Sequence, residues 1–183
     1  MSSVMFTEEA QAALEAAIAD ARARHNTYAD VEHMLLGLLG IQNDPLARLL
    51  TTEQRTTLRS AVENNLGQIR PEPLDQIDGL ANDLRAVMLR AGTEAEGMGH
   101  RVVNGGHLLI ALMEHDTPVQ QWLLEAGLVN PADARQTVAQ HSPKARDAGR
   151  VVEISPKQKA RHERPPEENT NPAVMTFIYI GIA

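Results

Sequence analysis

Two stretches of this chain align with each other without a gap. Phe6 aligns with Leu80 and His33 with His107, an offset of 74 residues in both cases. Each copy extends over about 70 residues, which is longer than the unit of a solenoid protein. We therefore expect two equivalent halves that pack against each other, rather than an open array of repeats.

The repeat divides the chain into a duplicated domain and a tail. We place the domain at residues 1–143, with repeat one at about 4–66, a linker at 67–79 and repeat two at about 80–141. The linker contains prolines that stop a helix. Residues 144–183 form a charged, proline-containing tail that ends in a short apolar, β-prone segment at 174–180.

Within each copy the apolar residues recur at helical spacing. In repeat one, an apolar stripe at intervals of three and four follows Thr7, which is a good N-cap. The stripe consists of Ala10, Ala13, Leu14, Ala17, Ile18 and Ala21. The run that begins at His33 is apolar nearly all round and predicts a buried helix. Aromatic residues make up only 3% of the chain, which disfavours strands.

The expected fold is therefore all-α, with eight helices as two pseudo-repeated four-helix halves and a mostly irregular C-terminal tail. In repeat one we place helices from Thr7 to about His25, from about Asp30 to Leu39, after Pro45 and from about Thr52 to Leu66. In repeat two we place them from about Asn82, from about Gly105, from Pro118 to Ala126 and from Pro131 to Gln140.

Composition narrows the classes of function. The chain contains no cysteine, which excludes disulfides and thiolate metal sites. Residues 1–143 hold 10 Arg and no Lys against 19 acidic residues, a balance that disfavours nucleic-acid binding and suits cationic peptides. The N-terminus has no signal-peptide pattern, and no segment has the length of a membrane helix. We expect a cytoplasmic protein that binds neither nucleic acid nor a membrane.

Motifs of catalysis are absent from the sequence. It contains no GxxxxGK[ST] phosphate loop, no GxSxG elbow and no HExxH zinc motif. We therefore expect no enzyme, no metal and no cofactor. His33 and His107 are expected to make internal hydrogen bonds before their helices, and Met88 and Met113 to pack in the core. Trp122 is either a core residue or one wall of a groove.

The duplicated motif resembles a known family. Phe6-Thr7-Glu8 opens an Ala-rich helix, Glu32-His33 begins the run EHMLLGLL, and Gly106-His107 begins its second copy, GHLLIALM. This pattern over about residues 4–141 resembles the Clp N-terminal (Clp repeat) domain of ClpC- and ClpA-type AAA+ unfoldases. The resemblance implies a substrate- and adaptor-docking module, here without ATPase modules.

The resemblance also implies binding residues. In ClpC-type relatives a glutamate before the histidine binds a phosphoarginine guanidinium, and a threonine and backbone amides bind its phosphate. Phe6, Thr7 and Glu32 match that site in repeat one, whereas repeat two has Ala81 and Gly106 in place of the threonine and the glutamate. Relatives also bind cyclic peptide antibiotics where the repeats meet, and Ser3 and Leu80 would line that inter-repeat groove.

Two functions follow as expectations. The first is a non-catalytic protein- and peptide-binding module that acts as an accessory or regulator of Clp-dependent proteolysis, with Clp unfoldase or protease components or their client peptides as partners. The second is a decoy that sequesters peptide ligands or macrocyclic antibiotics directed at the Clp unfoldase.

Overall fold

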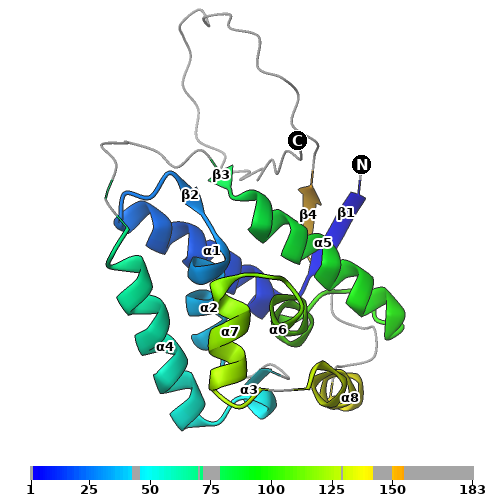
Figure 1. Cartoon of the computed structure of the whole chain (residues 1–183). Helices are drawn as coiled ribbons and strands as arrows, with labels where there is room; N and C mark the ends of the chain where they lie inside the picture. The colour runs from blue at the N-terminus through cyan, green and yellow to red at the C-terminus, as the bar shows by residue number, and fades with distance from the viewer. Residues whose placement is uncertain are drawn as a thin grey trace, which may run out of the picture.

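A computed structural model describes residues 2–42, 46–69, 71, 79–128, 130–141 and 150–154 (Figure 1). Within these residues it contains eight helices, as the periodicity predicted, and α3 is a single turn. Repeat one has α1 (Glu8–Ala23), α2 (Val31–Leu39), α3 (Leu46–Leu49) and α4 (Thr52–Leu66). Repeat two has α5 (Asn82–Gly97), α6 (Gly105–Met113), α7 (Pro118–Glu125) and α8 (Pro131–His141). The all-α class is confirmed.

The central helix of each repeat begins with the same hydrogen-bonded cap. Asp30 caps α2 and Asn104 caps α6, and in both cases the histidine three residues later returns a bond. The backbone N–H of Asp30 donates to Nδ1 of His33 over 3.1 Å, and that of Asn104 donates to Nδ1 of His107 over 3.0 Å. This reciprocal cap satisfies amides that a helix start leaves without partners.

The second ring nitrogen of each histidine also has a partner within the same repeat. Nε2 of His33 lies 3.0 Å from the amide group of Asn26, and Nε2 of His107 lies 2.8 Å from Nδ1 of His100. Asn26 and His100 occupy equivalent positions in the two repeats. The predicted structural role of His33 and His107 is confirmed, because both ring nitrogens are used inside the fold.

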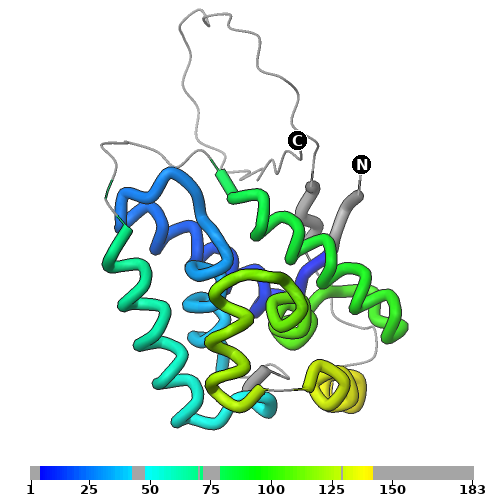
Figure 2. The backbone as a smooth tube through the Cα atoms, viewed as in Figure 1, coloured from blue at the N-terminus to red at the C-terminus, as the bar shows by residue number. Residues whose placement is uncertain are grey.

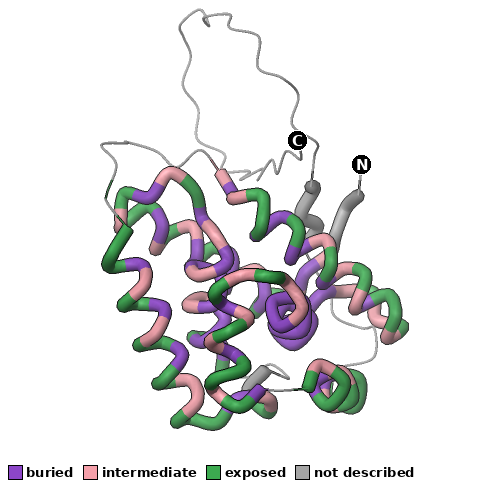
Figure 3. The backbone as a smooth tube through the Cα atoms, viewed as in Figure 1, coloured by how far each residue is buried: buried purple, intermediate pink, exposed green. Residues whose placement is uncertain are grey.

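The core is centred on α2 and α6. Every residue of α6 is buried, whereas α2 leaves Glu32, Leu36 and Gly37 partly exposed (Figure 3). Met88 and Met113 are buried as predicted, and Trp122 is partly buried against the core. Across the repeat boundary α4 packs beside α7 (Figure 2). Because α2 has partly exposed residues and α6 has none, repeat one is the half whose central helix remains partly accessible.

Short strands that the sequence did not predict join the two repeats. β2 (Tyr28–Ala29) pairs in parallel with β3 (Gly79–Leu80), so the segment before α5 lies against the segment before α2. Phe6 makes the equivalent parallel bridge to Val103, which precedes α6. The hydrogen bonds are equivalent too, because Thr7 N–H donates to Val103 O and Ala81 N–H to Ala29 O, both over 2.9 Å. The repeats are thus joined reciprocally.

Part of the tail, residues 150–154, forms a strand that the sequence did not predict. β1 (Ser2–Phe6) pairs antiparallel with β4 (Arg150–Ile154), and Phe6 lies opposite Arg150. Figure 1 shows these two strands side by side next to α5. The β-prone segment at 174–180 lies outside the described residues. Among the helices that the structure does describe, none has the length and apolar character to cross a membrane.

Candidate functional site: an apolar groove on repeat one

Two residues expected at binding surfaces lie in the core instead. Phe6 is 0% exposed and Leu80 is 2% exposed. The expectation that Leu80 lines an open inter-repeat groove is therefore corrected, because β2–β3 pairing turns its side chain inward. Ser3 lies in β1 opposite Glu153 of β4. The reciprocal strand contacts lie where the repeats meet.

The structure separates the other two expected ligands, Thr7 and Glu32. Thr7 caps α1, where its Oγ1 accepts a bond from Ala10 N–H over 3.3 Å, and its own N–H is used by Val103 in repeat two. Glu32 lies in the first turn of α2. The segment before α2 contains β2, which pairs with β3, the strand that precedes α5 in repeat two. Thr7 and Glu32 thus lie at different inter-repeat contacts rather than in one pocket.

The surroundings of Glu32 are acidic. Burial raises the pKa of its carboxyl group, and the neighbouring carboxylates of Asp30 and Asp83 raise it further. Burial raises the pKa of Asp30 as well. A phosphate group placed here would meet like charges, which costs free energy in a partly desolvated site. This corner of the molecule favours a cation over an anion.

In repeat two the position equivalent to Glu32 is Gly106, which has no room for a longer side chain. A Cβ atom on Gly106 would lie 2.5 Å from Cγ2 of Val138 in α8 and 3.1 Å from Oδ1 of Asn104. A glutamate therefore does not fit at position 106 unless the side chain of Val138 or α8 itself shifts. The sequence difference between Glu32 and Gly106 thus has a packing reason, namely the close contact of α8 with the start of α6.

The described residues form a shallow groove between α1 and the end of α2. Its volume is about 290 Å³. It is lined by Glu9, Ala12, Ala13, Ala16, Gly37, Gly40, Ile41 and Gln42. We call this surface the repeat-one groove. Its walls are mainly small and apolar, which suits contact with apolar groups.

Close helix contact shapes the floor of the repeat-one groove. A Cβ atom at Gly37 would lie 2.2 Å from the carbonyl oxygen of Ala13, a distance at which no side chain fits. Glycine at 37 thus lets α2 approach the backbone of α1. Arg55 holds the far end of α2, because its guanidinium donates to the carbonyl oxygens of Leu39 (3.2 Å) and Ile41 (2.9 Å).

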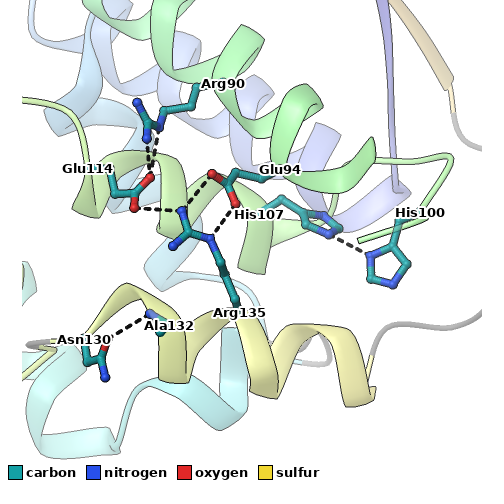
Figure 4. A network of polar contacts seen from close by, with 8 residues as sticks. All are labelled: Arg90, Glu94, His100, His107, Glu114, Asn130, Ala132 and Arg135. Carbon is teal, nitrogen blue, oxygen red and sulfur yellow. Dashed lines mark hydrogen bonds and ion pairs between the residues drawn. The ribbon is translucent and has the colours of Figure 1, made fainter. Parts of the chain in front are cut away.

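Repeat two carries charged side chains on the equivalent surface. At the offset of 74 residues, Ala16 corresponds to Arg90 and Gly40 to Glu114, and these two residues form an ion pair. Arg135 of α8 also binds Glu114 (2.7 Å) and Glu94 (2.8 Å) (Figure 4). We call these four residues the repeat-two ion network. It covers the surface that repeat one leaves open.

The electrostatics of the network support a structural role. Hydrogen bonds from Arg135 and Arg90 lower the pKa of Glu114 against the opposing effect of burial. The carboxylates of Glu94 and Glu114 raise the pKa of Arg135. Both shifts favour the charged forms of Glu114 and Arg135. Among the described residues there is no group of three or more acidic, histidine or cysteine side chains that could hold a metal.

The sequence analysis did not find the repeat-one groove, although a signal was present. At two positions where the aligned copies differ in polarity, repeat one has Ala16 and Gly40 and repeat two has Arg90 and Glu114. Such differences between equivalent helix positions mark a surface that has diverged. A comparison that considers only the residues shared by the two copies misses these differences.

Comparison with known proteins places this architecture in a family. The family model for the Clp repeat (R) N-terminal domain matches residues 5–126. Chaperone protein ClpB 1 of Parasynechococcus marenigrum (strain WH8102) is 33% identical over 152 residues, which cover 76% of this chain and 17% of ClpB 1. The chain therefore spans only 17% of the length of that curated relative.

Solved structures of N-terminal domains share the fold. The N-domain of ClpV from Vibrio cholerae has a TM-score of 0.63 at 17% identity and covers 74% of this chain and 84% of that one. The Hsp104 N-terminal domain from Candida albicans has a TM-score of 0.61 at 20% identity, with coverage of 76% and 94%. A complex of the ClpV N-domain with a VipB peptide has a TM-score of 0.61 at 16% identity, with coverage of 74% and 85%. This chain belongs to the Clp repeat (R) N-terminal domain family.

Proposed function

We propose that this chain is a docking module that holds an aliphatic segment of another polypeptide in the repeat-one groove. The observation that carries the proposal is the difference between the repeats. Repeat one leaves an apolar surface open where repeat two places the Arg90–Glu114 ion pair. The ClpV N-domain, which has the same fold, forms a complex with a VipB peptide, and this supports a peptide as the ligand.

The proposed binding is weak and reversible. Each aliphatic side chain that becomes fully buried contributes about 1.5–3 kcal/mol, and a shallow groove buries its ligand only in part. Association entropy and the ordering of a peptide offset much of this gain. A module of this kind suits the brief capture of clients. Membership of the Clp repeat (R) N-terminal domain family supports a role beside Clp proteins, and we propose that the chain is an accessory of Clp-dependent proteolysis in the cytoplasm.

The direct test transfers the repeat-two pair into repeat one. The double variant Ala16→Arg/Gly40→Glu places in the repeat-one groove the same two residues that α5 and the end of α6 already carry. The probe is a fluorescein-labelled peptide with a Leu-Ala-Leu-Ala-Leu core and Gln at both ends, here called the Gln peptide. Its anisotropy is titrated against wild-type and variant full-length chains.

We expect the Gln peptide to bind the wild-type chain and to lose at least tenfold in affinity for the double variant. Ala19→Arg serves as the control, because Ala19 is exposed on α1 but does not line the groove. Circular dichroism checks that both variants stay helical. Equal affinity for a folded double variant would contradict the proposal, and so would an equal loss in the control.

The accessory role has a separate test. Wild-type chain is added to a reconstituted Clp unfoldase and protease that degrade a fluorescent client, and the rate of degradation is followed. We expect the wild-type chain to change that rate and Ala16→Arg/Gly40→Glu to have no effect. Identical rates with and without wild-type chain would contradict the accessory role and would leave peptide docking to the binding assay.

A further inference from the structure

The repeat-one groove has one charged side chain at its edge. Among the described residues that line it, only Glu9 carries a charge, and the rest are small, apolar or neutral. Glu9 is exposed in the first turn of α1, and no ion pair is formed by it within the described part of the chain. The opposite wall, formed by Gly37, Gly40 and Ile41, contains no charge to repel or neutralise it.

In repeat two the equivalent carboxylate has a partner within the chain. Asp83 is the equivalent of Glu9, and its Oδ1 lies 3.3 Å from Nε2 of His115. His115 is in turn the equivalent of Ile41 on the groove wall. In repeat two a histidine of the chain itself therefore faces the first-turn carboxylate, whereas in repeat one the equivalent wall residue is Ile41. The carboxylate of Glu9 is left to face solvent or a ligand.

We propose that the repeat-one groove selects peptides in which a basic side chain stands next to the aliphatic ones, with the cation placed against Glu9. This inference rests on the proposed peptide docking and adds the chemical class of the ligand. The aliphatic side chains lie over Ala12, Ala16 and Gly40, and the basic one takes the place that His115 takes beside Asp83. The acidic balance of the duplicated domain attracts the same class of ligand over a longer range.

Glu9 also stabilises the start of α1, since a carboxylate in the first turn interacts favourably with the helix dipole. Its neighbour Glu8 has the same property, is also exposed and does not line the groove. Glu8→Gln therefore removes the same charge from the same turn. It is a matched control for Glu9→Gln in net charge and in helix stability.

The experiment compares three peptides that share the Leu-Ala-Leu-Ala-Leu core and carry Lys, Gln or Glu at both ends. Because both ends are changed, the direction of the bound peptide does not matter. Affinities are measured with full-length wild type, Glu9→Gln, Glu8→Gln and Glu9→Lys at low and at high salt. Screening by salt should reduce any preference that arises from an exposed ion pair.

We expect wild type to bind the Lys peptide about two- to fivefold more tightly than the Gln peptide, the range for one exposed ion pair. Glu9→Gln should lose most of this preference, Glu8→Gln should keep it, and Glu9→Lys should prefer the Glu peptide. Equal loss in Glu9→Gln and Glu8→Gln would overturn the inference, because the preference would then reflect net charge. Tight binding of all three peptides without preference would overturn it while leaving peptide docking intact. No binding of any peptide would overturn both.

Discussion

The contact between α1 and α2 makes a sharp prediction for Gly37→Ala. The added Cβ atom would lie 2.2 Å from the carbonyl oxygen of Ala13, and contacts below 3.0 Å are essentially never observed for a Cβ atom. The helices must therefore move apart by about 1 Å. Because the clash is with backbone rather than with a flexible side chain, we take the upper end of the overpacking range, about 3 kcal/mol.

Helix propensity offsets part of that cost. Alanine is favoured over glycine by about 1 kcal/mol inside a helix, so the net loss for Gly37→Ala is about 2 kcal/mol. For a chain of this size that corresponds to a fall in melting temperature of about 4–8 °C. Thermal unfolding followed by circular dichroism at 222 nm measures it, in the far-ultraviolet band typical of helices.

Gly97→Ala is the matched control for this prediction. Gly97 is exposed at the end of α5, and a Cβ atom there meets nothing within 4 Å. The control should melt at or slightly above the temperature of the wild type. A Gly37→Ala chain that is as stable as wild type, or more stable, would refute the close approach of α1 and α2 and with it the floor of the repeat-one groove.

Three further predictions follow from packing and charge. Gly106→Glu should destabilise the fold by about 3 kcal/mol or more in urea unfolding, because its side chain would meet Val138, and Val138→Ala should restore part of the loss. Burial holds the pKa of His107 at about 3 against 6.5 in the unfolded chain. As the pH falls, the unfolded state therefore binds a proton at His107 that the folded state excludes. The free energy of unfolding should fall by about 1 kcal/mol from pH 7.5 to 5.5. A pH-independent free energy of unfolding would contradict the buried neutral ring. Arg135→Gln should cost at most about 1 kcal/mol at low salt and less at high salt, because its side chain is 35% exposed; a large, salt-independent loss would contradict a surface network.

Much of the fold could be predicted because its signals are local. The spacing of Ala10, Leu14 and Ala17 defines the buried face of α1, and Thr7 and Asp30 are caps whose roles follow from residue type. The offset between His33 and His107 identifies the repeat. Each of these signals is contained in a single segment or in the comparison of two aligned segments.

The inter-repeat contacts could not be predicted in the same way. β2 and β3 have two residues each, too few for an alternating pattern to appear. Phe6 and Leu80 therefore had no visible partner in the sequence, although their pairing with the opposite repeat determines their burial. The strand Arg150–Ile154 lies in a charged tail, and its order depends on its pairing with β1.

The difference between the two repeats at the candidate site arises because side chains of α5 and α8 cover the equivalent surface of repeat two. Position 106 has no room for a glutamate because of Val138, a contact between segments 32 residues apart in the chain. The repeat-one groove exists because Ala16 and Gly40 have no long side chains. In the sequence, small residues in a helical segment are normally expected in the core, and only the structure shows that these two lie at the surface.

A nitrogen-15 amide NMR titration of the full-length chain with the Gln peptide tests the central claim most directly. If the repeat-one groove is the binding surface, the largest shift changes fall on amides that line it, those of Ala12, Ala16 and Gly40. Their repeat-two equivalents Ala86 and Arg90 should change little. Shift changes centred on Ala86 and Arg90, or none at saturating peptide, would contradict the claim.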